Sequence, residues 1–126
     1  MRRLALMLTL VALAGSAHAQ DEWARARTVE VRLSSFDFTP HDIVLPAGQP
    51  VVLHLVNSGS GGHNFAAPDF FRTARVRGNR PANGTVEVPS RQSVDIALVP
   101  AAGTYRLRCT HAFHTALGMR GRIVVR

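Results

Sequence analysis

The segment from Thr104 to Met119 reads TYRLRCTHAFHTALGM and joins an alternating run to a loop rich in soft donor atoms. In its first part, Tyr105, Leu107 and Cys109 alternate with arginines. A period of two is typical of a half-buried β-strand, whose successive side chains point to opposite faces. We therefore expect a strand from Thr104 to Cys109, with the Cys109 thiol facing inward.

The second part of the segment carries metal-binding chemistry. Cys109, His111, His114 and Met119 place one thiol, two imidazoles and one thioether within residues 109–119. Another imidazole, that of His63, follows a glycine- and serine-rich loop upstream. Two histidine nitrogens, a cysteine thiolate and a distant methionine sulfur are the donors that select copper and let it cycle between Cu(I) and Cu(II). The sequence therefore predicts a copper site.

The rest of the chain is a series of short apolar or alternating runs separated by turn residues. Besides 104–109, strands are expected at residues 28–33, 43–45, 51–56, 85–88, 93–99 and 122–125. Pro68 and Asp69, followed by residues 70–76, predict one short helix, because proline and an acidic residue suit a first helical turn. About eight short strands with turns between them predict an all-β fold, a Greek-key sandwich or barrel.

Length and composition limit the architecture to one small domain. The chain has 126 residues, 46% of them hydrophobic and 18% charged, which is enough apolar material for a packed core. Its single cysteine excludes an intramolecular disulfide framework and any zinc or iron–sulfur site built from several cysteines.

The N-terminus has the pattern of a secretory signal peptide. Arg2 and Arg3 precede an apolar run over residues 4–14, and the small-residue motif Ala17-His18-Ala19 follows. We expect residues 1–19 to be a signal peptide and residues 20–126 to form the domain. No later run has the length of about 20 apolar residues that spans a bilayer, so we expect a periplasmic protein without a membrane span.

The chain is strongly basic. It holds 15 arginine and lysine residues, all of them arginine, against 8 acidic residues, for a net charge of +7. Arg72, Arg75, Arg77 and Arg80 gather in one stretch, which could steer an acidic partner or an anionic membrane, or could simply keep the protein soluble. Nucleic acid is not expected as a partner, because exported proteins rarely meet it and no aromatic residues interleave with these arginines.

Two motifs together resemble the ligand segments of the cupredoxins, or blue copper proteins. One is Cys109-x4-His114-x4-Met119, and the other is His63-Asn64-Phe65 following the run 51–57. The resemblance covers nearly all of residues 20–126. It implies a Greek-key β-sandwich in which His63, Cys109 and His114 bind one copper ion as equatorial ligands and Met119 binds as the weak axial ligand. Asn64 matches the position whose side chain ties the two ligand loops together.

The resemblance also implies a function. Blue copper proteins carry single electrons between redox partners and are not enzymes, so we expect a monomeric carrier with an acidic redox partner protein. In this family the histidine at the place of His114 reaches the surface in an apolar patch, which here would include Phe113, Ala116 and Leu117. Arg120 or the cluster from Arg72 to Arg80 would then orient the partner.

Two departures from the family pattern keep alternatives open. His111 is an extra imidazole inside the loop, and it would change the site if it bound in place of His114 or Met119. Ala112-Phe113 replaces the Pro-Gly that azurin-like loops carry. The alternatives are a periplasmic copper-binding, copper-delivery or copper-tolerance protein with the same ligands, and a metal-free scaffold. His41, in a turn, and His54, within a strand, are not expected to be ligands.

Overall fold

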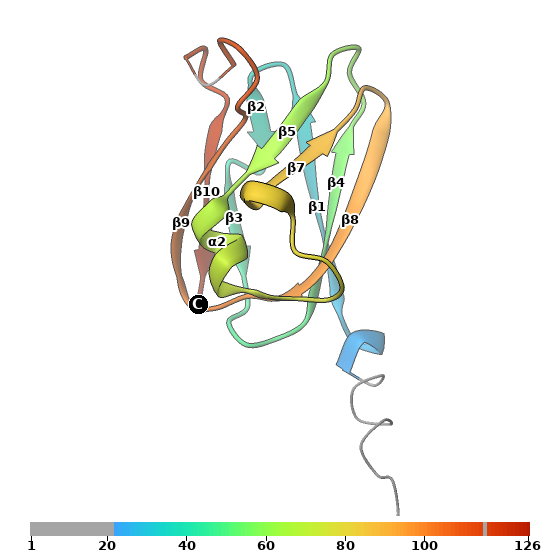
Figure 1. The fold of residues 1–126 in the computed structure, drawn as a ribbon, viewed down its shortest axis with the longest axis vertical. Helices are drawn as coiled ribbons and strands as arrows, with labels where there is room; N and C mark the ends of the chain where they lie inside the picture. Colours follow the sequence, from blue (N-terminus) through green and yellow to red (C-terminus); the bar gives the residue numbers. More distant parts are fainter. Residues whose placement is uncertain (1–21, 115) are drawn as a thin grey trace, which may run out of the picture.

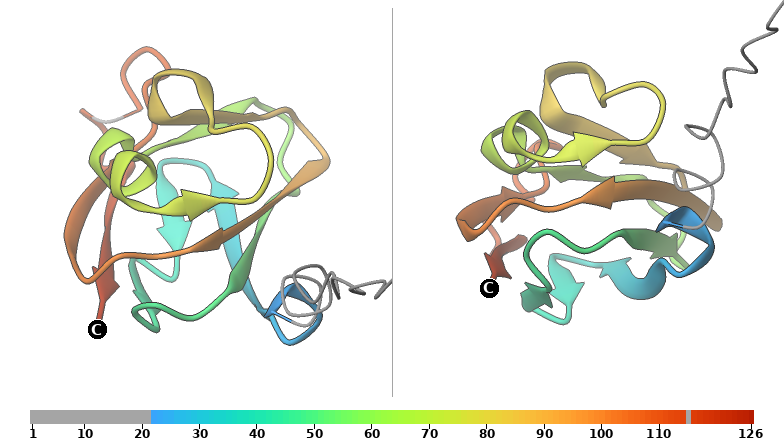
Figure 2. Two further views of the ribbon diagram at one scale, coloured as in Figure 1. Left: turned by 60° about the horizontal axis from the view of Figure 1, so that its bottom comes forward. Right: turned by 90° about the horizontal axis from the view of Figure 1, so that it is seen from below.

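A computed structural model describes residues 22–114 and 116–126 as two β-sheets packed face to face (Figure 1). The expected signal peptide lies outside the described residues. Figure 2 shows the two layers in a view tilted toward the bottom of the molecule and in a view from below, with the short helix α2 (Pro68–Thr73) beside them. The predicted all-β sandwich is confirmed, and the short helix expected after Pro68 is present.

Each sheet has five strands, and both mix parallel with antiparallel pairs. The first has the order β2-β1-β4-β8-β6, where the strands are β1 Arg27–Ser34, β2 Asp37–Thr39, β4 Val51–Asn57, β6 Arg75–Val76 and β8 Gln92–Val99. The second has the order β3-β10-β9-β5-β7, where the strands are β3 Asp42–Leu45, β5 His63–Ala66, β7 Thr85–Val88, β9 Gly103–Arg108 and β10 Arg120–Val125. The parallel pairs, β1 with β4 and β3 with β10, join strands distant in sequence.

The structure contains three short strands that the sequence patterns did not predict, namely β2, β5 and β6. Strands β2 and β6 have only three and two residues, and neither shows a recognisable period. All four residues of β5 are buried, so this strand shows no alternation. The helix expected to reach residue 76 ends at Thr73, because Arg75 and Val76 pair with β8 instead.

The core lies between the sheets and reaches the end of the sandwich that carries the donor residues. Its largest fully buried side chains include four phenylalanines, Phe38, Phe65, Phe70 and Phe71. Cys109 and Met119 belong to the same core, each 0% exposed. Burial of apolar surface contributes about 25 cal/mol per Å² to the free energy of folding, which makes such a core the main source of stability. Both sulfur atoms are therefore held in rigid, apolar surroundings.

The tight turn predicted at Asn83-Gly84 is present as the short 3-10 helix η1 (Ala82–Gly84) before β7. Gly84 has a φ of +63°, and a Cβ atom there would lie 2.3 Å from the Cα of Pro68. Only glycine fits this position, since both the backbone conformation and the close approach of the helix exclude a side chain.

Candidate metal centre

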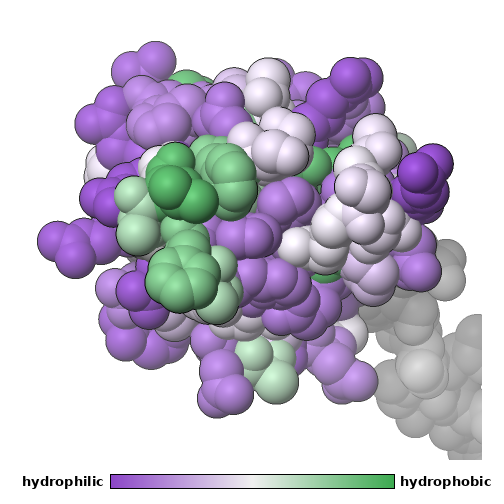
Figure 3. Space-filling model, turned by 90° about the horizontal axis from the view of Figure 1, so that it is seen from above, coloured by the Kyte–Doolittle hydropathy of each residue, from purple (hydrophilic) through white to green (hydrophobic). Residues whose placement is uncertain are grey.

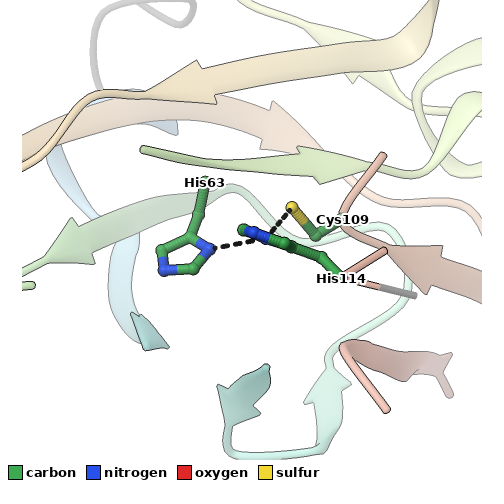
Figure 4. Close-up of side chains that lie close together, drawn as sticks. All are labelled: His63, Cys109 and His114. Atoms are coloured by element: carbon green, nitrogen blue, oxygen red, sulfur yellow. Dashed lines mark hydrogen bonds between the residues drawn. The ribbon is translucent and has the colours of Figure 1, made fainter. Parts of the chain in front are cut away.

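Three donor residues from distant parts of the chain meet at one end of the sandwich. The Nδ1 atoms of His63 and His114 lie 3.2 Å apart, and the Sγ atom of Cys109 lies 3.4 Å from Nδ1 of His114 (Figure 4). Ligand atoms of all three residues lie within 4.8 Å of one another. We call these residues the donor cluster. It is a compact set of two nitrogen atoms and one sulfur atom.

The ladder between β9 and β10 positions the two sulfur donors. Cys109 follows the last residue of β9 and Met119 precedes the first residue of β10. The amide of Cys109 donates a hydrogen bond to the carbonyl oxygen of Met119 at 3.1 Å, which continues the antiparallel pairing beyond the strands. Both side chains are buried in the core, so the loop between them begins and ends at a fixed place.

His63 enters the donor cluster from β5, the strand that follows the glycine-rich loop. It pairs with Val88 of β7 and is 5% exposed. Burial lowers the pKa of His63, and the positive charges that His114 and His111 can carry lower it further. The neutral imidazole, which is the form that binds a metal ion, is thereby favoured.

His114 lies in the loop 110–118, whose turns are closed by backbone hydrogen bonds. The amide of His114 donates to the carbonyl oxygen of His111 at 3.1 Å, and the amide of Met119 donates to that of His114 at 2.8 Å. The ring of Phe36 stands edge-on to the His114 ring, with centroids 5.2 Å apart. Phe36, at the turn between β1 and β2, was not found from the sequence, because a lone aromatic residue in a turn gives no spacing signal.

Asn64 connects the two halves of the site. Its backbone amide donates to Sγ of Cys109 at 3.4 Å, and its side-chain oxygen accepts from the amide of Thr110 at 2.8 Å. Its Nδ2 group donates to Oγ1 of Thr110 at 2.7 Å and to Oε1 of Glu87 at 2.9 Å. Because Asn64 is 1% exposed, these bonds tie β5 to the start of the ligand loop away from water.

His111 points to a carboxylate and is not a member of the donor cluster. Its Nε2 atom lies 2.9 Å from Oε2 of Glu87. Burial raises the pKa of Glu87, but hydrogen bonds from Asn64 and His111 lower it by more, so the carboxylate form is favoured. Glu87 was not identified from the sequence, because its contact with His111 depends on strand pairing.

The two histidines that were not expected to be ligands also lie outside the donor cluster. His41 bonds to the carboxylate of Asp42 at 2.9 Å, and His54 bonds to that of Asp95 across β4 and β8.

The donor cluster fits one copper ion by its chemistry. Two imidazole nitrogens and a buried thiol, with the buried thioether of Met119 on the residue opposite Cys109, form the donor set of blue copper sites. Cys109 is the only cysteine of the chain, so a disulfide bond within the chain is excluded and the thiol can serve as a metal donor. A hard cation such as Mg²⁺ or Ca²⁺ would require oxygen ligands, which the donor cluster lacks.

Comparison with known families assigns the fold and its class. Residues 3–125 match the family model described as a cupredoxin-like domain, and the chain belongs to this family. No curated protein sequence matches it significantly.

Among solved structures, auracyanin B is 25% identical, with a TM-score of 0.61 over 80% of this chain and 89% of that one. Auracyanin A of Chloroflexus aurantiacus, described as a blue copper protein, is 22% identical, with a TM-score of 0.56 over 79% of this chain and 98% of that one. The McoA multicopper oxidase of Aquifex aeolicus is 16% identical, with a TM-score of 0.60, and matches 96% of this chain but only 32% of its own length. At 22% and 16% identity, the likenesses to auracyanin A and to the McoA oxidase show a shared fold and nothing more.

Within the described residues, no helix is both long enough and apolar enough to cross a membrane.

Proposed function

We propose that this protein is a blue copper electron carrier in which His63, Cys109 and His114 bind one copper ion and Met119 is the weak axial ligand. The observation that carries the proposal is the convergence of two Nδ1 atoms and one Sγ atom within 4.8 Å at the end of a cupredoxin-like sandwich. Copper in such a site supplies one-electron exchange between Cu(I) and Cu(II).

The protein's contribution is to hold the donors in nearly one arrangement. Cys109 and Met119 are fixed by the core and by the hydrogen bond between their backbones. Asn64 fixes the thiol from the other side, through its amide and its contacts with Thr110. Little rearrangement is then needed on oxidation or reduction, since partners around the ligands restrict their orientation.

His114 is the ligand best placed to deliver the electron to a partner. It is only partly buried, and the residues around it are apolar and exposed: Phe36 is 40%, Leu117 60% and Phe113 80% exposed. We call Phe36, Phe113 and Leu117 the apolar patch. Figure 3, which looks onto this end of the molecule, shows a hydrophobic area bordered by hydrophilic surface. Such an area favours close contact with a partner protein.

The biological setting belongs to the same proposal. The pattern of residues 1–19 supports export by a signal peptide, with residues 20–126 as the domain and the periplasm as its location. We propose a monomeric carrier without enzymatic activity. The auracyanin likeness supports a carrier, while the oxidase likeness reflects a shared fold.

A copper-handling role is the second candidate, because the His111 ring lies 5.5 Å from the His114 ring and could offer copper another nitrogen. Cu(II) titration of the purified metal-free protein, followed by visible absorption and electron paramagnetic resonance, separates the two. An intense thiolate charge-transfer band with a narrow parallel hyperfine splitting, lost in Cys109→Ser but kept in His111→Ala, supports the carrier. A weak band, or one that needs His111, supports copper handling, and no binding at all contradicts both.

A further inference from the structure

Four arginines stand in two facing pairs on the outer side of the second sheet. In the register of β9 and β10, Arg108 lies opposite Arg120 and Arg106 lies opposite Arg122, and all four are exposed. We call them the arginine face. Directly opposite residues of an antiparallel pair lie about 5 Å apart, and alternate residues along a strand about 7 Å apart. The arginine face is therefore dense in positive charge.

This arrangement costs stability, because like charges directly opposite each other on a sheet repel. Arg122 is compensated by a salt bridge to Asp42 of β3. Within the part of the chain that the structure describes, neither Arg106 nor Arg108 has a salt bridge or a side-chain hydrogen bond to an acidic residue. The fold itself thus gains little from the charges of these two residues.

The arginine face is continuous with the metal centre. Arg108 is bonded to Cys109 and Arg120 to Met119, so the pair nearest the end of the sandwich is one residue away from both sulfur donors. Consecutive Cα atoms are about 3.8 Å apart, so Arg108 and Arg120 lie directly beside the two ends of the loop that carries His114. A partner held by these arginines would also lie beside the loop that carries His114.

We propose that the arginine face is the docking surface for an acidic redox partner protein, an inference that rests on the proposed function. An apolar patch next to a charged rim is the usual anatomy of a protein interface. The flat guanidinium group pairs with carboxylates through two hydrogen bonds, which favours arginine at such a rim. The cluster from Arg72 to Arg80 is less suited, because Arg72 pairs with Asp69, Arg75 pairs with Glu22, and Arg80 binds backbone carbonyl oxygens.

The favoured occupant is a protein and not a membrane. An anionic bilayer would attract every exposed arginine with little regard to position, whereas electron exchange requires docking beside His114. Steering by local charge raises association rates about 10- to 1000-fold and weakens as salt screens it.

The test compares Arg106→Gln/Arg108→Gln with the matched control Arg25→Gln/Arg27→Gln. Both variants remove two exposed positive charges, and the control positions lie at the other end of the sandwich, where β1 begins (Figure 1). Binding to poly-L-glutamate and to vesicles of equal phosphatidylglycerol and phosphatidylcholine is measured at low and high salt. Near-ultraviolet circular dichroism verifies that each variant is folded.

A second measurement follows electron exchange of the copper-loaded protein with hexacyanoferrate, an anion, and with the tris(phenanthroline)cobalt cation. We expect Arg106→Gln/Arg108→Gln to weaken polyglutamate binding and slow the hexacyanoferrate reaction about three- to tenfold at low salt, and to speed the cobalt reaction. The control variant should change polyglutamate binding and both electron-exchange rates by less than about twofold. Equal effects of both variants, or binding to vesicles alone, would overturn the proposal.

The two proposals can fail separately. If the blue band is normal but the Arg106→Gln/Arg108→Gln variant and its control bind polyglutamate equally, the proposed docking surface is refuted. The proposed electron carrier is then still supported. Position-dependent polyglutamate binding without a blue band would overturn the carrier, and with it the redox nature of the partner.

Discussion

The amide of Cys109 donates a hydrogen bond to the carbonyl oxygen of Met119 at 3.1 Å, and the two buried sulfur side chains thereby open and close one loop. The same register turns their neighbours Arg108 and Arg120 outward. Because side chains alternate along a strand, one ladder supplies donors to the interior and charge to the surface. Site and docking face are consequently parts of one structural unit.

Met119 should set the reduction potential without being needed for the blue colour. In Met119→Leu the charge-transfer band remains, and the potential rises by more than about 59 mV, a tenfold change in a one-electron equilibrium. The reason is that removing a weak donor from an apolar site disfavours the more highly charged Cu(II). The matched variant Met119→Gln replaces the thioether with an amide donor, and its reduction potential should lie below that of Met119→Leu. Voltammetry checks both, and equal potentials in the three proteins would contradict the axial role.

His111 should be dispensable for the blue site. In His111→Ala the imidazole bound to Glu87 is lost, while the three residues of the donor cluster are unchanged. We expect the same band position and copper stoichiometry, with less than about a twofold change in copper affinity. Competition with a chelator measures that affinity. A tenfold or greater loss would mean that His111 is a ligand.

His114→Gly should open the site while leaving the fold intact. The side chain is partly exposed and belongs to a loop, so its removal leaves the core unchanged. We expect the blue band to weaken or shift, added imidazole to restore it, and electron exchange with partners to slow. Absorption spectra with and without imidazole test this. An unaltered spectrum together with an unaltered exchange rate would exclude His114 as ligand and exit.

Asn64 should stabilise both the fold and the geometry of the thiolate. Asn64→Ala removes three side-chain hydrogen bonds, to Thr110 twice and to Glu87 once, and we expect a loss of about 2 kcal/mol in the free energy of unfolding. The charge-transfer band should also broaden.

Asn57 offers the matched control for that variant. It is equally buried and also makes three side-chain hydrogen bonds, but none of them reaches Cys109 or Thr110. Asn57→Ala should destabilise the protein without altering the band. If both variants changed the spectrum alike, the effect of Asn64 would be general loosening of the fold.

Asp42 should make the stability depend on pH in the acid range. Hydrogen bonds from Arg122 and then His41 hold the pKa of Asp42 below its usual value. A carboxylate with a lowered pKa in the folded state contributes stability above its unfolded pKa, and this contribution is lost as the pH falls through the folded value. Asp42→Asn should therefore lower Tm slightly at neutral pH and make no difference near pH 2. Thermal unfolding of both proteins at several pH values measures this difference in Tm. An equal difference at neutral pH and near pH 2 would refute the prediction.

Local patterns in the sequence predicted the strands that have an alternating face, since burial on one side of a sheet imposes a period of two. They also gave the spacing of Cys109, His114 and Met119, because these residues lie on one short loop. Strands β2, β5 and β6 escaped prediction because they are too short or too fully buried to alternate.

The tertiary structure alone decided which distant residues meet. His63 reaches His114 because β5 and β9 are neighbours in one sheet, and Phe36 reaches it because the turn after β1 lies at the same end of the sandwich. Glu87 came to hold Asn64 and His111 through the pairing of β5 with β7. The period of two in a sequence indicates which face of a strand is buried, but it does not indicate which strands pair with it. The amino-acid sequence by itself therefore determined the class of fold and the donor chemistry, and strand pairing determined the geometry of the site and its surroundings.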